Sequence, residues 1–346
     1  MAHDHNLVVF AQTWHISFGI LGTILNGSLV FLAVFKSPKA IQLYSKLIIN
    51  FALTDLFACL LDMFIEIRLL PSPNEATMTY ILNGFCTYFG LNTCTIGLSL
   101  FIHTLTHSLW SLLISFGYRY FILFHTSPKL KHVLLTILIF YIPSFIQAMT
   151  YWTNFVDRAT ILPIAKRVYP EYNFSEEPGL LTGITNLFSV SAMYAILHMT
   201  LPVTPVYISI FILRRKIIKM LMRSRNVMSK ETKAVHAQLL KALTFQALIP
   251  VAAWTAVYTV LAKKYTHYNF NVTVQFGLLR GKVFEYLIFS TVIFMPVISP
   301  ITYLIYVRPY RLCLLRTFCG KCAGSAVEDK NRTRFYTQYD YSTTRQ

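Results

Sequence analysis

The stretch that decides the fold is the apolar segment Phe289–Arg311, FSTVIFMPVISPITYLIYVRPYR. It is long enough to cross a hydrocarbon core of about 30 Å as a helix, and it ends in Arg308 and Arg311. Pro296 and Pro300 interrupt it, and in a membrane bundle neighbouring helices, hydroxyl groups or water satisfy the carbonyls that a proline frees. We therefore predict a kinked final membrane span that moves within a bundle.

The composition indicates that the rest of the chain is also embedded in a membrane. Of 346 residues only 13% are charged, and the mean hydropathy is +0.52, which excludes a soluble globular protein. Apolar blocks of about twenty residues predict helices, because membrane-spanning strands are shorter and alternate in polarity. We expect seven spans, at Trp14–Phe35, Leu47–Leu70, Leu91–Tyr118, Val133–Trp152, Leu187–Leu213, Ala242–Leu261 and Val283–Tyr306. The predicted fold class is an all-α membrane protein, a seven-transmembrane helix bundle.

The basic residues predict the orientation of this bundle. The net charge is +17, and Lys and Arg fall mainly in alternate connections, above all in Arg214–Lys241 and the tail, although the sixth connection goes against the trend. By the positive-inside rule we expect an extracellular amino terminus (1–13), a seven-helix domain (14–306) and a cytoplasmic tail (307–346). Charges placed in this way indicate a lipid bilayer as the surrounding and no nucleic-acid partner.

Three kinds of modification are expected from this topology. The sequons at Asn173 and Asn271 lie in connections assigned outside and are predicted glycosylation sites. Cys313, Cys319 and Cys322 follow the last span beside basic residues, a setting typical of palmitoylation.

The remaining modification is a disulfide, for which the spacing leaves two alternatives open. Cys86 and Cys94 either pair with each other or stay unpaired. On a continuous helix eight residues span about 12 Å, beyond the limit of about 7 Å between disulfide Cα atoms. A bond therefore requires the third helix to begin near Asn92.

The second predicted span carries an unusual row of acids. Asp55, Asp62 and Glu66 are seven and four residues apart, so they lie on one stripe of a helix. Ionisable groups in a bilayer usually face a cavity or a partner, so we predict an aqueous crevice or an ion site, with Asn26 of the first span as another polar member. A structural alternative pairs Glu66 with Arg68 or with interfacial water.

Two histidines of the third span, His103 and His107, are one helical turn apart and could hold a metal ion. No further ligands follow in the sequence, so core hydrogen bonding is the better interpretation. We expect no metal and no cofactor.

Several motifs resemble those of rhodopsin-type receptors. They are Asn50-Phe-Ala-Leu-Thr-Asp55-Leu in span two, Arg119 at the end of span three, and Ser299-Pro300-x-x-Tyr303 in span seven. The chain departs from that pattern where Tyr118 stands in place of an acid and Ser299 in place of an asparagine. The usual cysteine link between span three and the second extracellular loop is also missing.

The chain is more similar to nematode chemosensory receptors of the serpentine receptor delta class. The resembling motifs are Lys36-Ser-Pro-Lys39, Ile65-Glu-Ile-Arg-Leu-Leu-Pro71, Asn83-Gly-Phe-Cys86-Thr-Tyr-Phe-Gly90, His103-Thr-Leu-Thr-His-Ser-Leu-Trp110 and Pro309-Tyr-Arg311. The resemblance implies a receptor in the ciliary plasma membrane of sensory neurons that acts through a heterotrimeric G protein.

A receptor of this kind needs a ligand pocket and a switch. We expect a mostly apolar pocket with few polar points near the outer ends of the spans. The predicted pocket residues are Glu66, Asn92, Tyr194, His198, Trp254, Tyr258 and Glu285. The predicted switch and coupling residues are Arg119, Pro250, Ser299, Pro300 and Tyr303. Since no acid adjoins Arg119, we expect packing and neutral hydrogen bonds to hold the resting state.

The sequence thus predicts a chemosensory G-protein-coupled receptor for a small odorant-like or pheromone-like molecule. The alternative is a ligand-gated channel or secondary transporter that uses the acidic stripe of span two. Against the alternative, the two halves of the chain show no internal repeat. An enzyme is not expected, because no hydrolase motif occurs.

Overall fold

The computed structural model describes residues 2–37, 41–72, 76–170, 172–223, 230–264 and 282–318. Beyond residue 251, the sixth span is described by its backbone alone, so nothing is said of the side chains of Trp254 and Tyr258. The predicted modification sites that lie outside the described residues are Asn271, Cys319 and Cys322.

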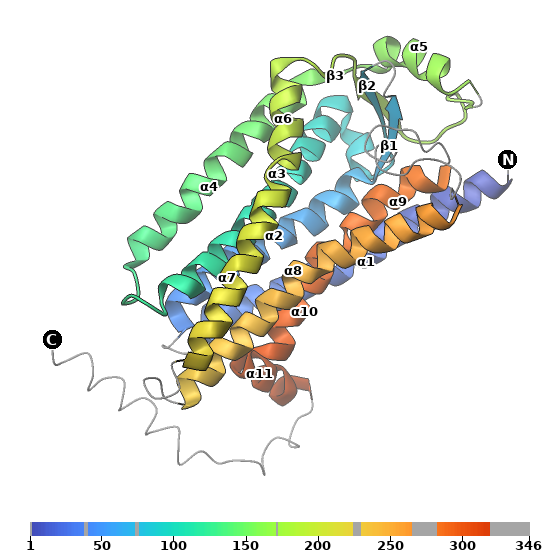
Figure 1. Ribbon diagram of the computed structural model, residues 1–346. Coiled ribbons are helices and arrows are strands. Elements are labelled where there is room, and N and C mark those ends of the chain that lie inside the picture. The colour runs from blue at the N-terminus through green and yellow to red at the C-terminus, as the bar shows by residue number, and fades with distance from the viewer. Residues whose placement is uncertain are drawn as a thin grey trace.

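Seven apolar spans form one elongated bundle (Figure 1). They are α1 (Ala2–Phe35), α2 (Gln42–Ile65), α3 (Leu91–Phe121), α4 (Leu130–Tyr151), α6 with α7 (Val190–Thr200 and Val203–Arg223), α8 (Lys230–Lys264) and α9 with α10 (Lys282–Val292 and Phe294–Tyr306). By length and composition each contains a stretch able to cross a membrane. The predicted seven-helix bundle is therefore confirmed. A last helix, α11 (Arg308–Phe318), follows the seventh span.

Helix α3 is the centre of the bundle, since it packs against α2, α4, α7 and α8. Two apolar clusters lie along it. One includes Tyr44, Phe116 and Tyr303, whereas the other includes Leu98 and Phe101 and continues into a small sheet at one end. We call the end with the sheet the sheet end, and the opposite end, where α11 lies, the basic end (Figure 1).

Prolines interrupt the fifth and seventh spans. The fifth span breaks between α6 and α7 at Pro202. The seventh breaks at Ile293, because Pro296 has no N–H to donate to the carbonyl of Val292 one turn earlier. Helices α8 and α10 continue through Pro250 and Pro300, the two predicted hinges.

The second span is as long as predicted but begins and ends five residues earlier, at Gln42 and Ile65. It ends at Ile65 and not at Leu70, because Glu66 adopts a left-handed conformation with φ of 40° and its N–H bonds to the carbonyl of Asp62. The chain then continues as a strand. The first helix is longer than its predicted span and begins at Ala2.

A four-stranded antiparallel sheet covers the sheet end, and the sequence analysis did not predict it. It consists of β1 (Ile67–Ser72), β2 (Thr77–Leu82), β3 (Phe155–Val156) and β4 (Leu180–Ile184), in the order β1-β2-β4-β3. Strand β2 pairs Tyr80 with Leu69 of β1 and with Thr182 of β4. The sheet therefore joins the connection after the second span to the connection after the fourth.

Helix α5 (Arg158–Val168) covers the far face of this sheet (Figure 1). Its Ile161 packs so closely on Gly183 that a Cβ atom there would lie 2.6 Å from the Ile161 side chain. Asp157 caps α5 by accepting a hydrogen bond from the N–H of Thr160 at 3.1 Å. The bond from the Thr160 hydroxyl and then this N–H bond lower the pKa of Asp157.

Cys86 and Cys94 form a disulfide in the structure, with their Cα atoms 4.9 Å apart. Cys86 lies in a short 3₁₀ helix, η3 (Phe85–Phe89), and α3 begins only at Leu91. The start of α3 near Asn92 is the geometry that the sequence analysis required for this bond. A second 3₁₀ turn, η4 (Trp152–Asn154), links α4 to β3.

Candidate functional site

A buried polar network connects α2, α3, α8 and α10 in the middle of the bundle. The hydroxyl of Ser108 donates to Asp55 Oδ1 at 2.8 Å, and Ser299 is a further hydrogen-bonding neighbour of this carboxylate. Gln246 Nε2 in turn donates to the Ser299 hydroxyl at 2.7 Å. Asn50 donates to Ser111 at 2.9 Å. Ser299 of α10 thus contacts α2 through Asp55 and α8 through Gln246, so a shift of α10 would change its hydrogen bonds to both helices.

The predicted acidic stripe divides into two environments, one around Asp55 and one around His15. Asp55 belongs to the central network, whereas Asp62 Oδ2 pairs with His15 Nδ1 of α1 at 2.7 Å. Glu66 lies buried just past the end of α2, where it hydrogen-bonds to Gln12 and is a charged neighbour of His15 and Asp62. The proposed pairing of Glu66 with Arg68 is wrong, because Arg68 binds other carboxylates. The sequence analysis missed His15, which lies 47 positions from its partner and belongs to no motif.

Asn26 and the two histidines of α3 make contacts between helices. Asn26 Nδ2 donates to the Pro296 carbonyl of α10 at 2.8 Å. His107 Nε2 lies 3.3 Å from Asn50 Oδ1, and His103 and His107 both pack edge-to-face on Tyr141. Within the described residues, no group of three or more His, Cys, Asp or Glu residues is placed to hold a metal ion.

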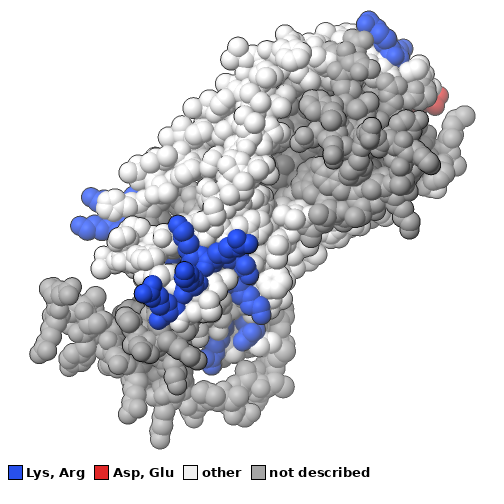
Figure 2. Space-filling model, viewed as in Figure 1, with Lys and Arg blue, Asp and Glu red and all other residues white. Residues whose placement is uncertain are grey.

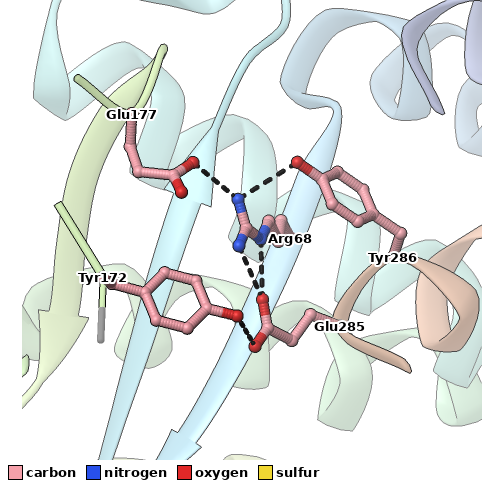
Figure 3. A network of polar contacts seen from close by, with 5 residues as sticks. All are labelled: Arg68, Tyr172, Glu177, Glu285 and Tyr286. Carbon is pink, nitrogen blue, oxygen red and sulfur yellow. Dashed lines mark hydrogen bonds and ion pairs between the residues drawn. The ribbon is translucent and has the colours of Figure 1, made fainter. Parts of the chain in front are cut away.

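Arg68 of β1 is the centre of a second network, at the sheet end (Figure 3). Its side chain is 2% exposed and forms ion pairs with Glu285 of α9 and with Glu177 of the segment before β4, both at 2.8 Å. Tyr172 donates to the other oxygen of Glu285 at 2.6 Å, and Arg68 Nη1 donates to the Tyr286 hydroxyl at 3.1 Å. One guanidinium thus joins the sheet, the connection before β4 and the seventh span.

The electrostatics of this network keep Arg68 charged and Tyr172 neutral. Burial alone would lower the pKa of Arg68, but Glu285, Tyr286 and Glu177 raise it above its ordinary value. Burial and the Glu285 carboxylate also raise the pKa of the Tyr172 hydroxyl, which therefore remains a donor.

The predicted pocket residues whose side chains are described come from α6, the start of α3, the end of α2 and α9. Tyr194 and His198 of α6 face α4, where they bind the Pro143 carbonyl at 2.9 Å and Gln147 Oε1 at 3.0 Å. Asn92 is exposed at the start of α3. Glu285 is held by Arg68, and Glu66 lies at the end of α2.

An open hollow of about 520 Å³ lies at the sheet end. Its lining residues are Thr87, Leu91, Arg158, Gly179, Leu180 and Leu181. None of them is a predicted pocket residue. They come from η3, the start of α3, the start of α5 and the beginning of β4, so this hollow depends on the sheet that the sequence analysis did not foresee.

At the basic end, Arg119 of α3 is buried between Tyr44 of α2 and His236 of α8. It is 3% exposed, and its guanidinium lies 3.7 Å from the ring centre of Tyr44 of α2. Arg119 Nη1 donates to His236 Nδ1 of α8 at 3.3 Å, which requires His236 to be neutral at that nitrogen. Arg119 Nε and Nη2 have no hydrogen-bond partner among the described residues. Tyr303 is also buried in this region.

The surface around Arg119 is strongly basic. Figure 2 shows Lys and Arg side chains gathered at the end opposite the sheet. The exposed basic residues there are Lys36, Lys46, Lys129, Lys131, Arg215, Lys216, Lys219, Arg223, Lys241, Arg308 and Arg311. In the part of the chain whose side chains are described, no Asp or Glu lies among them. Half-buried Cys313 lies on α11 at the same end.

Comparison with solved structures finds a similar fold. The chain resembles squid rhodopsin with a TM-score of 0.53 and 16% sequence identity, over 89% of this chain and 84% of that chain. At this identity the likeness concerns the fold alone, which is a bundle of seven membrane-spanning helices.

The family follows from the sequence. The family described as serpentine type 7TM GPCR chemoreceptor Srd matches residues 11–316, and the chain belongs to this family. Similar relatives from Caenorhabditis elegans are serpentine receptors class delta-18 (51% identical over 88% of this chain and 87% of the relative) and delta-19 (50% over 88% and 87%). A third, class delta-3, is 34% identical over 86% and 84%. The resemblance stated from the motifs is therefore confirmed, and the protein is a multi-pass membrane chemoreceptor and not an enzyme.

Proposed function

We propose that this chemoreceptor binds a small molecule at its sheet end, outside the cell, and activates a heterotrimeric G protein through its basic end. The observation that carries the proposal is the state of Arg119. It is a buried cation without a carboxylate partner among the described residues, surrounded by a basic surface. A buried donor left without an acceptor costs about 1–3 kcal/mol, so an acceptor supplied by a partner would stabilise an open basic end.

The resting contacts at this end are weak enough to be opened by a ligand. Arg119 is held by the Tyr44 ring and by one neutral hydrogen bond to His236, in line with the expectation of neutral contacts. A cation–π contact contributes about 0.5–2 kcal/mol. Movement of α8 away from α3 would break the bond to His236 and uncover the guanidinium.

Ser299, next to Pro300, would carry the signal from the centre of the bundle to this end. Ser299 binds Gln246 of α8, and Tyr303 lies one turn further along α10 within the apolar cluster at the basic end. Bending at Pro300 or at Pro250 of α8 would therefore shift both helices together. The predicted switch residues are supported by this continuity of contacts.

Modification and location complete the proposal. Asn173 is exposed in the connection before β4, as a glycosylation site must be. Asn271 is proposed as the second glycosylation site. Cys313 of α11, with Cys319 and Cys322, would carry palmitate at the inner membrane surface. The proposed location is the plasma membrane of sensory cilia.

A ligand screen in cells tests the proposal. Cells that express the receptor are exposed to small-molecule libraries, and calcium and cyclic nucleotides are recorded. Once an active compound is found, Arg119→Ala should abolish the response while surface expression and ligand binding stay near wild type. Alanine at Glu66, His198 and Trp254 should reduce potency. Unchanged potency in all three would place the pocket elsewhere, and a full response from Arg119→Ala would refute the coupling role.

A further inference from the structure

The two carboxylates bound by Arg68 are held with unequal strength. Glu285 Oε2 accepts from Arg68 Nε at 2.8 Å, its Oε1 accepts from Tyr172, and its side chain is 5% exposed. Glu177 has one hydrogen-bonded partner among the described residues, Arg68 Nη1, and its side chain is 15% exposed. Glu285 is therefore a fixed part of the network, whereas Glu177 is the carboxylate that can leave.

Phe174 in the core and Gly179 against Leu82 fix the segment on both sides of Glu177, so the group that can turn away is the Glu177 side chain. Its neighbours Ser175, Glu176 and Pro178 are all exposed, and the segment lies before the first residue of β4. If the Glu177 side chain turned toward solvent, Arg68 Nη1 would lose its carboxylate and would be left with the Tyr286 hydroxyl. Arg68 would then have an N–H donor without a carboxylate acceptor, available to a ligand from solvent at the sheet end.

The charge balance decides what can take that position. The network contains one guanidinium and two carboxylates, so its formal charge is −1 with Glu177 in place. An external carboxylate that replaces Glu177 leaves this balance unchanged and adds no buried charge. An ammonium group in the same position would lie against the Arg68 guanidinium, which is unfavourable in a buried site.

The hollow at the sheet end lies next to this position along the chain. Its residues Gly179, Leu180 and Leu181 begin two residues after Glu177, within about 7 Å of chain reach. Leu91, Leu180 and Leu181 contribute apolar surface to a lining that is otherwise polar, and Arg158 is the one charged residue among those that line it. Its volume of about 520 Å³ is in the range of small-molecule sites.

From these observations we propose that Arg68 and the adjoining hollow form a binding site for a monocarboxylate with an apolar body, whose carboxylate takes the place of Glu177. The inference rests on the proposed ligand-binding function and names the chemical class of the ligand. Because Arg68 also holds Glu285 of α9, replacement of Glu177 would free the segment before β4 from the seventh span.

Equilibrium dialysis of radiolabelled hexanoate against the purified full-length receptor in lipid nanodiscs tests the site, with empty nanodiscs as the background. Hexylamine and 1-hexanol serve as probes with the same chain and a different head group. The main variant is Glu177→Gln, which removes the competing carboxylate from a partly exposed position and leaves the Arg68–Glu285 pair intact. Glu176→Gln is the matched control, since it removes the same charge from the same segment without touching Arg68.

We expect saturable binding of hexanoate and none of hexylamine. Glu177→Gln should bind hexanoate about tenfold more tightly, because a charge-assisted hydrogen bond no longer competes. Glu176→Gln should match the wild type, and Arg68→Lys should bind more weakly because it loses the planar fork. The proposal is overturned if hexanoate binds neither the wild type nor Glu177→Gln, if Glu177→Gln leaves its affinity unchanged, or if hexylamine binds and Glu177→Gln abolishes that binding.

The assay contains no G protein, so its outcome is separate from the test of coupling. If hexanoate fails while another compound gives a response that depends on Arg119, the receptor function stands and the carboxylate class falls. If hexanoate binds while no G protein responds, the site stands and the coupling account falls.

Discussion

Removal of Arg68 should be among the most destabilising single changes at the sheet end. Arg68→Met keeps much of the apolar stem and removes the guanidinium, which leaves Glu285 buried with the Tyr172 hydroxyl as its remaining donor. Breaking a buried ion pair from one side costs about 3–5 kcal/mol. Adding Glu285→Gln removes the stranded charge, so the double variant should recover about 0.5–3 kcal/mol of that loss.

Unfolding of the purified receptor in mixed detergent micelles measures both quantities. Arg158→Met is the control: Arg158 is an exposed arginine of the same end that donates to the Phe174 carbonyl at 2.7 Å, and its loss should cost about 1 kcal/mol or less. The reasoning is refuted if Arg68→Met costs no more than this control. It is equally refuted if Glu285→Gln adds its own loss to that of Arg68→Met and recovers nothing.

Two further predictions concern the disulfide and the topology. Mass spectrometry under non-reducing conditions should find Cys86 bonded to Cys94, and Cys86→Ser should lower stability by about 2.5 kcal/mol, the entropic value for so short a loop; any other pairing would contradict the structure. A tag at Ala2 should stain intact cells and a tag after Gln346 only permeabilised ones, while Asn173→Gln should lose one glycan; the reverse staining would invert the membrane orientation.

The seven spans could be predicted because each membrane span is a continuous apolar segment, which can be recognised without knowing the rest of the fold. The segment Phe289–Arg311 is apolar over the thickness of a bilayer, and its prolines gave the correct indication of an interrupted helix. The break itself falls at Ile293, one turn before Pro296, since the missing hydrogen bond is that of the preceding turn. The motif at Arg119 likewise located the basic end.

The sheet end could not be predicted in this way, because its contacts join distant parts of the chain. Strand β4 is only five residues long, and its partner β2 lies in another connection. Arg68 and Glu285 are 217 positions apart, and the sequence around each residue gives no indication of its partner. The periodicity that placed Glu66 on the acidic stripe failed locally, because the helix ends at Ile65, although Glu66 remains a neighbour of Asp62 and His15.

Nucleotide exchange on purified heterotrimeric G proteins tests the central claim most directly, and His236 allows the test before any ligand is known. His236→Lys places a second cation beside Arg119 and should open the basic end, whereas His236→Gln keeps a neutral acceptor. A shift of about 1 kcal/mol changes the open population about fivefold.

With a panel of G proteins, His236→Lys should therefore raise ligand-free exchange about fivefold on at least one member, by the same conversion. His236→Gln should stay near wild type, and Arg119→Ala in the His236→Lys background should return exchange to the level without receptor. Exchange that is unchanged by His236→Lys on every G protein, together with an ion current through the same purified receptor in planar bilayers, would contradict the account and favour a channel.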